Sequence, residues 1–175
     1  FVNDIEGVAG ALGLSQPPRD EVSPLLLPLV RNSYAFNFLY WRLYRLSQIG
    51  QPDRKWEWQL GLHHHPDAWW LHQQQLLTLY EGTKAEKIPF IVVVFPSMNR
   101  PQESQFVTER ILNLYREVGT PVLDVAELIK DIPLDERVAT PVDPHPSELV
   151  HERVAEALYD IFLEMKLAEA GQAQR

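Results

Sequence analysis

The sequence contains no cysteine. This absence excludes disulfide bridges, thiolate zinc sites and a cysteine nucleophile, and it leaves the redox compartment open. Positive charge is also scarce, since the formal net charge is −8. Without a basic run to neutralise phosphates, nucleic acid is not an expected partner. Apolar runs are short, and the leucine-rich run at residues 24–30 is broken by proline, so no membrane span is predicted.

The 175 residues are 45% hydrophobic, which is enough for one sizeable core, so we expect a single domain over residues 1–175. The opening residues 1–4 (FVND) are typical of the end of a strand already in progress. A lone apolar strand needs sheet neighbours, so we expect this chain to be the C-terminal part of a longer one. Within it, we predict core strands and helices over residues 88–168, and a lid or insertion with an aromatic helix over residues 5–87.

The first third of the chain is predicted to be a loop followed by that aromatic helix. Residues 5–32 are rich in glycine and proline, which indicates a loop with little regular structure. Residues 33–47 predict a helix, with Ser33 as its N-cap. Apolar side chains occupy nearly the whole circumference of this helix, so we favour packing in the core over an acyl-binding wall or a partner surface.

A second irregular stretch is predicted over residues 51–67, and it contains three adjacent histidines at positions 63–65. Adjacent residues do not share a face in a helix or a strand, and no carboxylate stands at helical ligand spacing. We therefore expect exposed loop histidines rather than a metal site. Asp67 is the expected cap of a following helix over residues 68–86.

The strongest strand signal is the β-branched and aromatic run at residues 88–96, which is bounded by prolines. Because the run lacks alternation, we expect it to be buried on both faces, as in a parallel sheet. An amphipathic helix over residues 103–118 should close at Gly119, before a second strand at residues 121–125. A last helix is predicted from residue 147 to about residue 168. This alternation predicts an α/β fold with a parallel sheet.

One stretch places a carboxylate and an imidazole two residues apart, ahead of the last helix. Asp143 and His145 each precede a proline, and Pro144 and Pro146 bias them to extended geometry. A histidine with a supporting carboxylate can act as a general base on a serine hydroxyl. The spacing alone is equally consistent with a structural corner in which His145 only packs at the start of the helix.

Three points of the sequence are expected to converge at one edge of the sheet, because ligands in open α/β sheets bind beyond the carboxyl ends of the strands. Asn3-Asp4 ends the first apolar run, and residues 96–100 follow the central strand. The third point is the loop that carries Asp143 and His145.

Residues 143–158 (DPHPSELVHERVAEAL) resemble the last block of the SGNH (GDSL) hydrolase superfamily, in which an Asp and a His complete the catalytic triad. Residues 1–4 resemble the block Gly-x-Asn-Asp, whose Asn side chain donates to the oxyanion hole. The strand at residues 91–95 followed by Pro96 also suits the family, and the blocks occur in the family's order. The resemblance implies a flavodoxin-like three-layer α/β/α sandwich with a parallel sheet, incomplete at its N-terminus.

The same resemblance implies a role for each matched residue. His145 is the general base, Asp143 orients it, and Asn3 donates to the oxyanion hole, while no metal or cofactor is implied. The chain departs from the family in its Asp-x-His spacing, where Asp-x-x-His is commoner. Phe1 and Val150 replace glycines. The block with the nucleophilic serine would precede Asn3, so we expect that serine on an upstream segment or fragment, without which this chain is inactive.

The leading hypothesis is therefore an SGNH-type serine esterase or lipase. Its expected partners are a small-molecule or lipid ester and the upstream segment that carries the serine. Acyl or acetyl transfer to a carbohydrate hydroxyl on the same fold is the first alternative. A non-catalytic binding module that uses the aromatic helix is the second.

Overall fold

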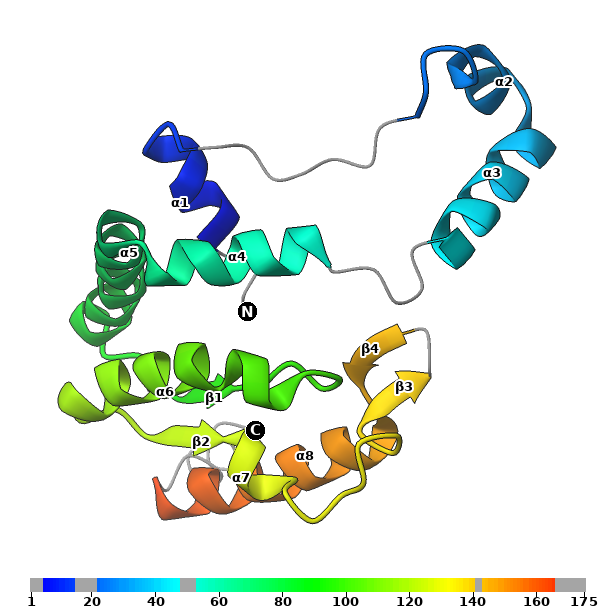
Figure 1. Cartoon of the computed structure of the whole chain (residues 1–175). Helices are drawn as coiled ribbons and strands as arrows, with labels where there is room; N and C mark the ends of the chain where they lie inside the picture. Colours follow the sequence, from blue (N-terminus) through cyan, green and yellow to red (C-terminus); the bar gives the residue numbers. More distant parts are fainter. Residues whose placement is uncertain (1–4, 15–21, 48–52, 141–142, 166–175) are drawn as a thin grey trace.

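The fold is seen in a computed structural model that describes residues 5–14, 22–47, 53–140 and 143–165 (Figure 1). In chain order the elements are α1 (Glu6–Ala11), α2 (Leu27–Asn32), α3 (Tyr34–Ser47), α4 (Arg54–His64), α5 (Pro66–Ala85), β1 (Val92–Val94), α6 (Pro101–Glu117), β2 (Val122–Asp124), α7 (Val125–Leu128), β3 (Val138–Thr140), β4 (Asp143–Pro146) and α8 (Glu148–Glu164). The described chain is a mixed α/β structure that is mostly helical.

The parallel pair predicted from the sequence is present. β1 pairs with β2 in parallel, with Val92 opposite Val122 and Val94 opposite Asp124. The strand itself is shorter than the apolar run that contains it. Val94 is buried, but Val92 and Val93 are only half-buried, so the expectation of burial on both faces is wrong for them. The run lines a cavity of about 270 Å³ shared with α5 and α6.

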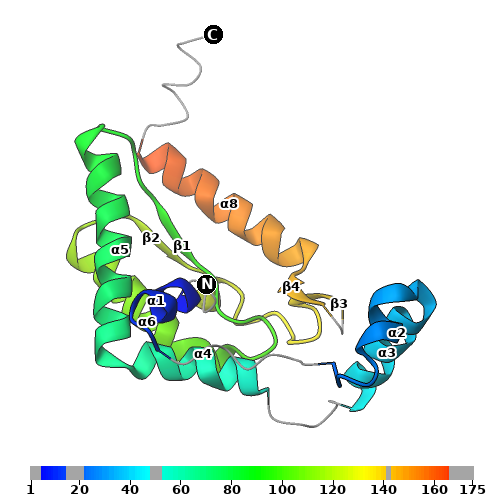
Figure 2. The ribbon, with the colours of Figure 1, turned by 90° about the horizontal axis from the view of Figure 1, so that it is seen from above.

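One apolar core joins the sheet to α7 and α8. Val125, Ile129, Val150 and Val154 are among its buried members, and Val93 of β1 packs against them. The stripe predicted on the last helix is therefore the face that enters the core. Figure 2 shows α8 running beside the two strands.

α6 connects β1 to β2 and packs near both strands. Val107, Leu112 and Tyr115 are buried. The helix ends at the C-cap Val118, and Gly119 follows with φ of 76°. A positive φ of this kind favours glycine, so the predicted C′ position is confirmed.

A second apolar core joins α1, α4 and α5, and it corrects two expectations. Within residues 5–32, the described parts are not mostly loop, because α1 forms beside the fully buried Ile5 and Val8, and α2 forms at residues 27–32. Residues 51–67 are not irregular either, since α4 occupies most of them. Its N-cap is Asp53, whose side chain accepts a hydrogen bond from the Trp56 amide at 3.0 Å. In both stretches, tertiary packing of apolar side chains stabilises helices that the local sequence signals do not predict.

The three histidines do not lie together on an exposed loop. His63 is fully buried in α4, while His64 is exposed and stacks on Phe106 with 4.1 Å between ring centroids. His65 is the N-cap of α5, where its Nδ1 accepts from the Ala68 amide at 3.4 Å. The predicted cap, Asp67, lies in the first turn instead. Among the described residues, no group of three acidic or histidine side chains is placed to hold a metal ion.

The aromatic helix forms where it was predicted, with Ser33 Oγ accepting from the Phe36 amide at 3.3 Å. Its expected burial in the core is wrong. α3 packs on α2, and Figures 1 and 2 both show the pair set apart from α5, α6 and α8. No helix in the described ranges combines the length and the apolar content needed to cross a bilayer.

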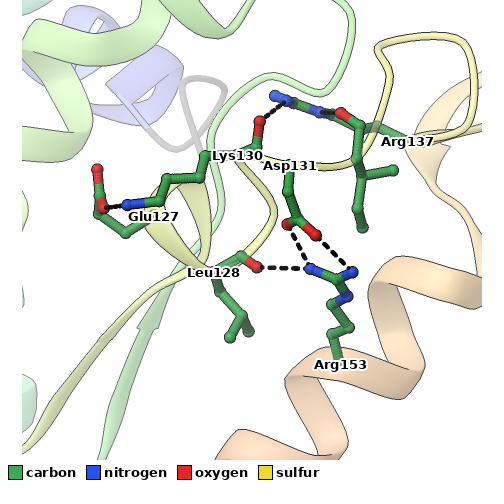
Figure 3. Close-up of polar contacts among 7 residues, drawn as sticks. Glu127, Leu128, Lys130, Asp131, Arg137 and Arg153 are labelled. Carbon is green, nitrogen blue, oxygen red and sulfur yellow. Dashed lines mark hydrogen bonds and ion pairs between the residues drawn. The ribbon is translucent and has the colours of Figure 1, made fainter.

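Polar contacts hold the turn after α7 on α8 (Figure 3). The Arg153 guanidinium pairs with Asp131 through both of its terminal nitrogens, with 2.8 Å from Nη2 to Oδ2. Its Nη1 also donates to the Leu128 carbonyl at 3.3 Å. The contact with Arg153 lowers the pKa of Asp131 below its ordinary value of 3.8. The pair therefore orients a turn that the apolar core holds in place.

The first prediction tests that apolar core. Ile129→Ala should lower the free energy of unfolding by about 2–5 kcal/mol, because a fully buried side chain leaves a cavity in a packed environment. Urea denaturation measures this change. The control is Leu163→Ala on the exposed side of α8, expected to stay within about 0.5 kcal/mol. Equal effects at the two positions would contradict the placement of the core.

Candidate functional site

The β3–β4 hairpin presents Asp143 and His145. β4 pairs antiparallel with β3, with Val138 opposite Pro146 and Thr140 opposite Asp143, and the register shifts between these pairs. The extended geometry matches the bias that each proline imposes on the residue before it. The hairpin itself was not predicted, because a strand with alternate prolines carries no ordinary strand signal.

The end of β4 is anchored at Ser147, which is also the N-cap of α8. The Ser147 amide donates to the Arg137 carbonyl at 2.9 Å, and its hydroxyl donates to the Glu136 carbonyl at 2.6 Å. The same hydroxyl accepts from the Val150 amide at 3.4 Å. These contacts tie the start of the helix to the chain preceding β3, so the two residues before Ser147 have little freedom to move.

Arg137 extends this anchor to the turn after α7. Its Nε donates to the Ile132 carbonyl at 2.7 Å, and its Nη2 donates to the Lys130 carbonyl at 3.1 Å. Figure 3 shows Arg137 and Arg153 acting on this same turn. The hairpin that carries Asp143 and His145 is therefore supported from the packed core and is not a free loop.

Asp143 and His145 contact each other. The Nδ1 atom of His145 is hydrogen-bonded to Asp143 Oδ1, and the same oxygen accepts from the His145 amide at 3.1 Å. The hydrogen bond from the imidazole, supported by the one from the amide, lowers the pKa of the Asp143 carboxyl below its ordinary value of 3.8. Asp143 is thus held ionised and fixes the orientation of the ring.

This arrangement leaves the other ring nitrogen available. With Nδ1 occupied by the carboxylate, the neutral tautomer carries its proton on Nδ1 and keeps a lone pair on Nε2. The His145 side chain is 81% exposed, so the Nε2 end is accessible to a reacting group. A carboxylate-supported imidazole with a free Nε2 can take a proton from a hydroxyl nucleophile.

A cleft of about 270 Å³ lies beside His145. It is lined by the loop after β1, by β4 and by the start of α4: Asp53, Trp56, Phe95, Pro96, Ser97, Met98, Asn99, Arg100, Pro144, His145 and Pro146. The convergence predicted for residues 96–100 and the His145 loop is confirmed. The third predicted point, Asn3-Asp4, lies outside the described residues, so the oxyanion role of Asn3 stays a prediction.

The wall from α4 was missed in the sequence. Arg100 Nη2 lies 3.4 Å from Asp53 Oδ2, and its guanidinium lies over the Trp56 ring at 5.5 Å from the centroid. The Trp56 indole also donates to the Glu103 carboxylate. The sequence holds one local signal for this wall, which is Asp53 as the N-cap of a helix that contains Trp56. The prediction of an irregular stretch over residues 51–67 left that signal unused.

Ser97 is the serine that lines this cleft. Its hydroxyl donates to Asn99 Oδ1 at 3.0 Å, and its amide donates to Ser104 Oγ at 2.9 Å. It follows β1 in a loop held by these side chains rather than on a strand-to-helix elbow. From its sequence context, Ser97 is not predicted to be the nucleophile, and this stays a prediction.

Comparison of the chain with protein-family profiles, with curated proteins and with solved structures gives no match.

The second prediction tests the Asp143–His145 contact. His145→Ala should raise the pKa of the Asp143 carboxyl toward 3.8, because the hydrogen bond from the imidazole is the main cause of the lowered value. A carboxyl NMR titration measures this. A lowered folded-state pKa stabilises the fold above about pH 4, and that stabilisation is lost as the pH falls through the lowered value.

Asp131 is the internal control for that titration. Its lowered pKa comes from Arg153 and should be the same in both proteins. An Asp143 pKa that does not move in the His145→Ala variant would contradict the contact.

Proposed function

We propose that this chain carries the base and its supporting carboxylate of an SGNH-type serine esterase or lipase. The observation that supports the proposal most strongly is the hydrogen bond between Asp143 and His145 Nδ1 beside an open cleft. In a Ser-His-Asp mechanism, the carboxylate holds the imidazole tautomer and stabilises the imidazolium that forms.

A serine hydroxyl attacks the ester carbonyl while His145 Nε2 takes its proton. The tetrahedral oxyanion is stabilised by backbone amides and by the side chain of Asn3. His145 then returns the proton to the leaving alcohol, and water releases the acid by the reverse sequence. We propose that the serine belongs to a block before Asn3, on a preceding segment or fragment, as the resemblance implies.

We also propose that the described strands and helices form part of a three-layer α/β/α sandwich. The parallel β1–β2 pair, with α6 between the strands in sequence and α8 packed against them, is compatible with one part of a three-layer α/β/α sandwich. Further parallel strands would complete the sheet. The α2–α3 hairpin and α4 are proposed to form a lid or an acyl pocket around the cleft.

The third prediction tests the proposed base. In the full-length protein, His145→Ala should lower kcat/KM for a short-chain p-nitrophenyl ester by about a thousandfold or more, because the serine loses its proton acceptor. The matched control is His64→Ala, an exposed histidine at the opposite end of α4 from the cleft-lining Trp56, which should change the rate less than about twofold. An unchanged rate in His145→Ala would rule out the triad assignment.

A specific feature of the cleft favours acyl transfer to a carbohydrate as the second candidate. Trp56 supplies an aromatic surface, and Asp53, Asn99 and Arg100 supply carboxylate, amide and guanidinium groups beside it. Sugar hydroxyls bind to planar polar groups of this kind, and a few convergent polar groups in a partly apolar cleft give orientation and specificity.

The fourth prediction separates the two reactions. If the acceptor is a sugar, adding a soluble polysaccharide to the full-length protein with an activated acetyl ester should produce acetylated polysaccharide, detected by NMR. Trp56→Ala should then lower transfer by about tenfold while leaving hydrolysis nearly unchanged. Hydrolysis without any transfer would leave the esterase as the function and reject the transferase.

A further inference from the structure

One described segment of this acidic chain carries arginines but no acidic residue. Residues 22–47, which hold α2 and α3, contain Arg31, Arg42 and Arg45 and no aspartate or glutamate, whereas the whole chain has a formal net charge of −8. The Arg31 and Arg42 side chains are exposed. The hairpin is therefore a basic surface, and its charge is opposite to that of the protein that carries it.

The same hairpin exposes large apolar side chains. Leu39, Leu43 and Leu46 are 51%, 57% and 57% exposed. Their spacing of four and three residues places them on one side of α3. Leu26, just before α2, lines a shallow hollow together with Leu39 and Leu43. Leu25 and Leu29 are also exposed, at 88% and 50%. Large contiguous apolar patches on a soluble protein are typical of interaction sites.

The exposed leucines belong to a packed structure. Val30 of α2 is buried at 6% exposure, and the Asn37 side chain donates to its carbonyl at 3.1 Å across the hairpin. Ser33 caps the start of α3. The patch is thus the outer surface of two helices that are held together by their own contacts.

The residues beside the leucines indicate which partner this surface fits. Trp41 lies edge-on to Tyr40 and to Tyr44, with centroid distances of 5.2 and 5.6 Å. Trp41 is two residues from both Leu39 and Leu43, so it lies on the other side of α3, and the leucines and arginines are the groups that meet a partner. Leucines on one side of such a helix enter the acyl region, and arginines bind anionic headgroups.

We propose that the α2–α3 hairpin is a docking surface for an anionic lipid bilayer. α3 has 14 residues and at 1.5 Å per residue is about 21 Å long, so it lies in the interface rather than across the membrane. Leu39, Leu43 and Leu46 insert at the acyl boundary, and Arg31 and Arg42 contact lipid phosphates. This proposal does not depend on the esterase activity.

A second copy of the chain fits this surface less well. In a two-fold contact of hairpin on hairpin, the arginines of one copy would face those of the other, and helices α2 and α3 carry no carboxylate to pair with them. An anionic lipid surface supplies the missing negative charge and accepts the leucines at the same time.

The fifth prediction is a vesicle-flotation experiment with the full chain. The protein should float with vesicles that contain phosphatidylglycerol and not with pure phosphatidylcholine vesicles. Binding should weaken as salt rises from about 0.05 to 0.5 M, because screening shortens the reach of the arginine charges. Arg42→Glu and Leu43→Asp should each weaken binding by about tenfold.

Matched controls test whether the hairpin is responsible. Arg116→Glu on α6 and Leu79→Asp on α5 change an exposed arginine and an exposed leucine elsewhere, and they should leave binding unchanged. The absence of cysteine makes Leu43→Cys a single labelling site. A polarity-sensitive dye there should shift to the blue on anionic vesicles, and the same dye at Leu79→Cys should not.

Three results would overturn the proposal. The first is no flotation with anionic vesicles. The second is flotation that the control variants reduce as much as the hairpin variants do. The third is a protein that elutes as a dimer in light scattering, becomes monomeric with Leu43→Asp, and does not bind vesicles, which would show that a second copy covers the surface.

Discussion

The packing of the turn after α7 against α8 is the contact on which the candidate site depends. Ile129 and Val150 are fully buried there, and removing their surface from water holds the two segments together. Two carbonyls of this turn accept hydrogen bonds from the Arg137 side chain. The Arg137 carbonyl in turn accepts a hydrogen bond from the Ser147 amide. Apolar burial supplies the adhesion, and the hydrogen bonds set the position of the hairpin that carries His145.

Proline and the carboxylate act at a shorter range. The prolines on either side of His145 restrict the backbone, and Asp143 restricts the imidazole through Nδ1. Together they hold one titratable group with its Nε2 open beside the cleft. Such preorganisation is what a general base needs, because little reorganisation is left for the reaction step.

The arginines of this acidic chain serve two purposes. Arg137 and Arg153 donate to backbone carbonyls or to Asp131 within the fold, so their charges are used to join segments. Arg31 and Arg42 are exposed beside an apolar helical surface. The contrast separates arginines with partners inside the described fold from exposed arginines that are available for the proposed membrane contact.

The sequence by itself determined the parallel strand pair, the boundaries near α3, α6 and α8, and the loop after β1 as a neighbour of His145. The strands and helix boundaries follow from local signals: a β-branched run, helical periodicity, Ser33 as a cap, and Gly119 as the residue after a helix. The loop after β1 follows from the rule that ligands bind beyond the carboxyl ends of parallel strands. Only the tertiary structure decided that α1 and α4 form, that His63 is buried, that Trp56 joins the cleft, and that α3 stays outside the core. Contacts between segments distant in the chain decide burial, and no local pattern encodes those contacts.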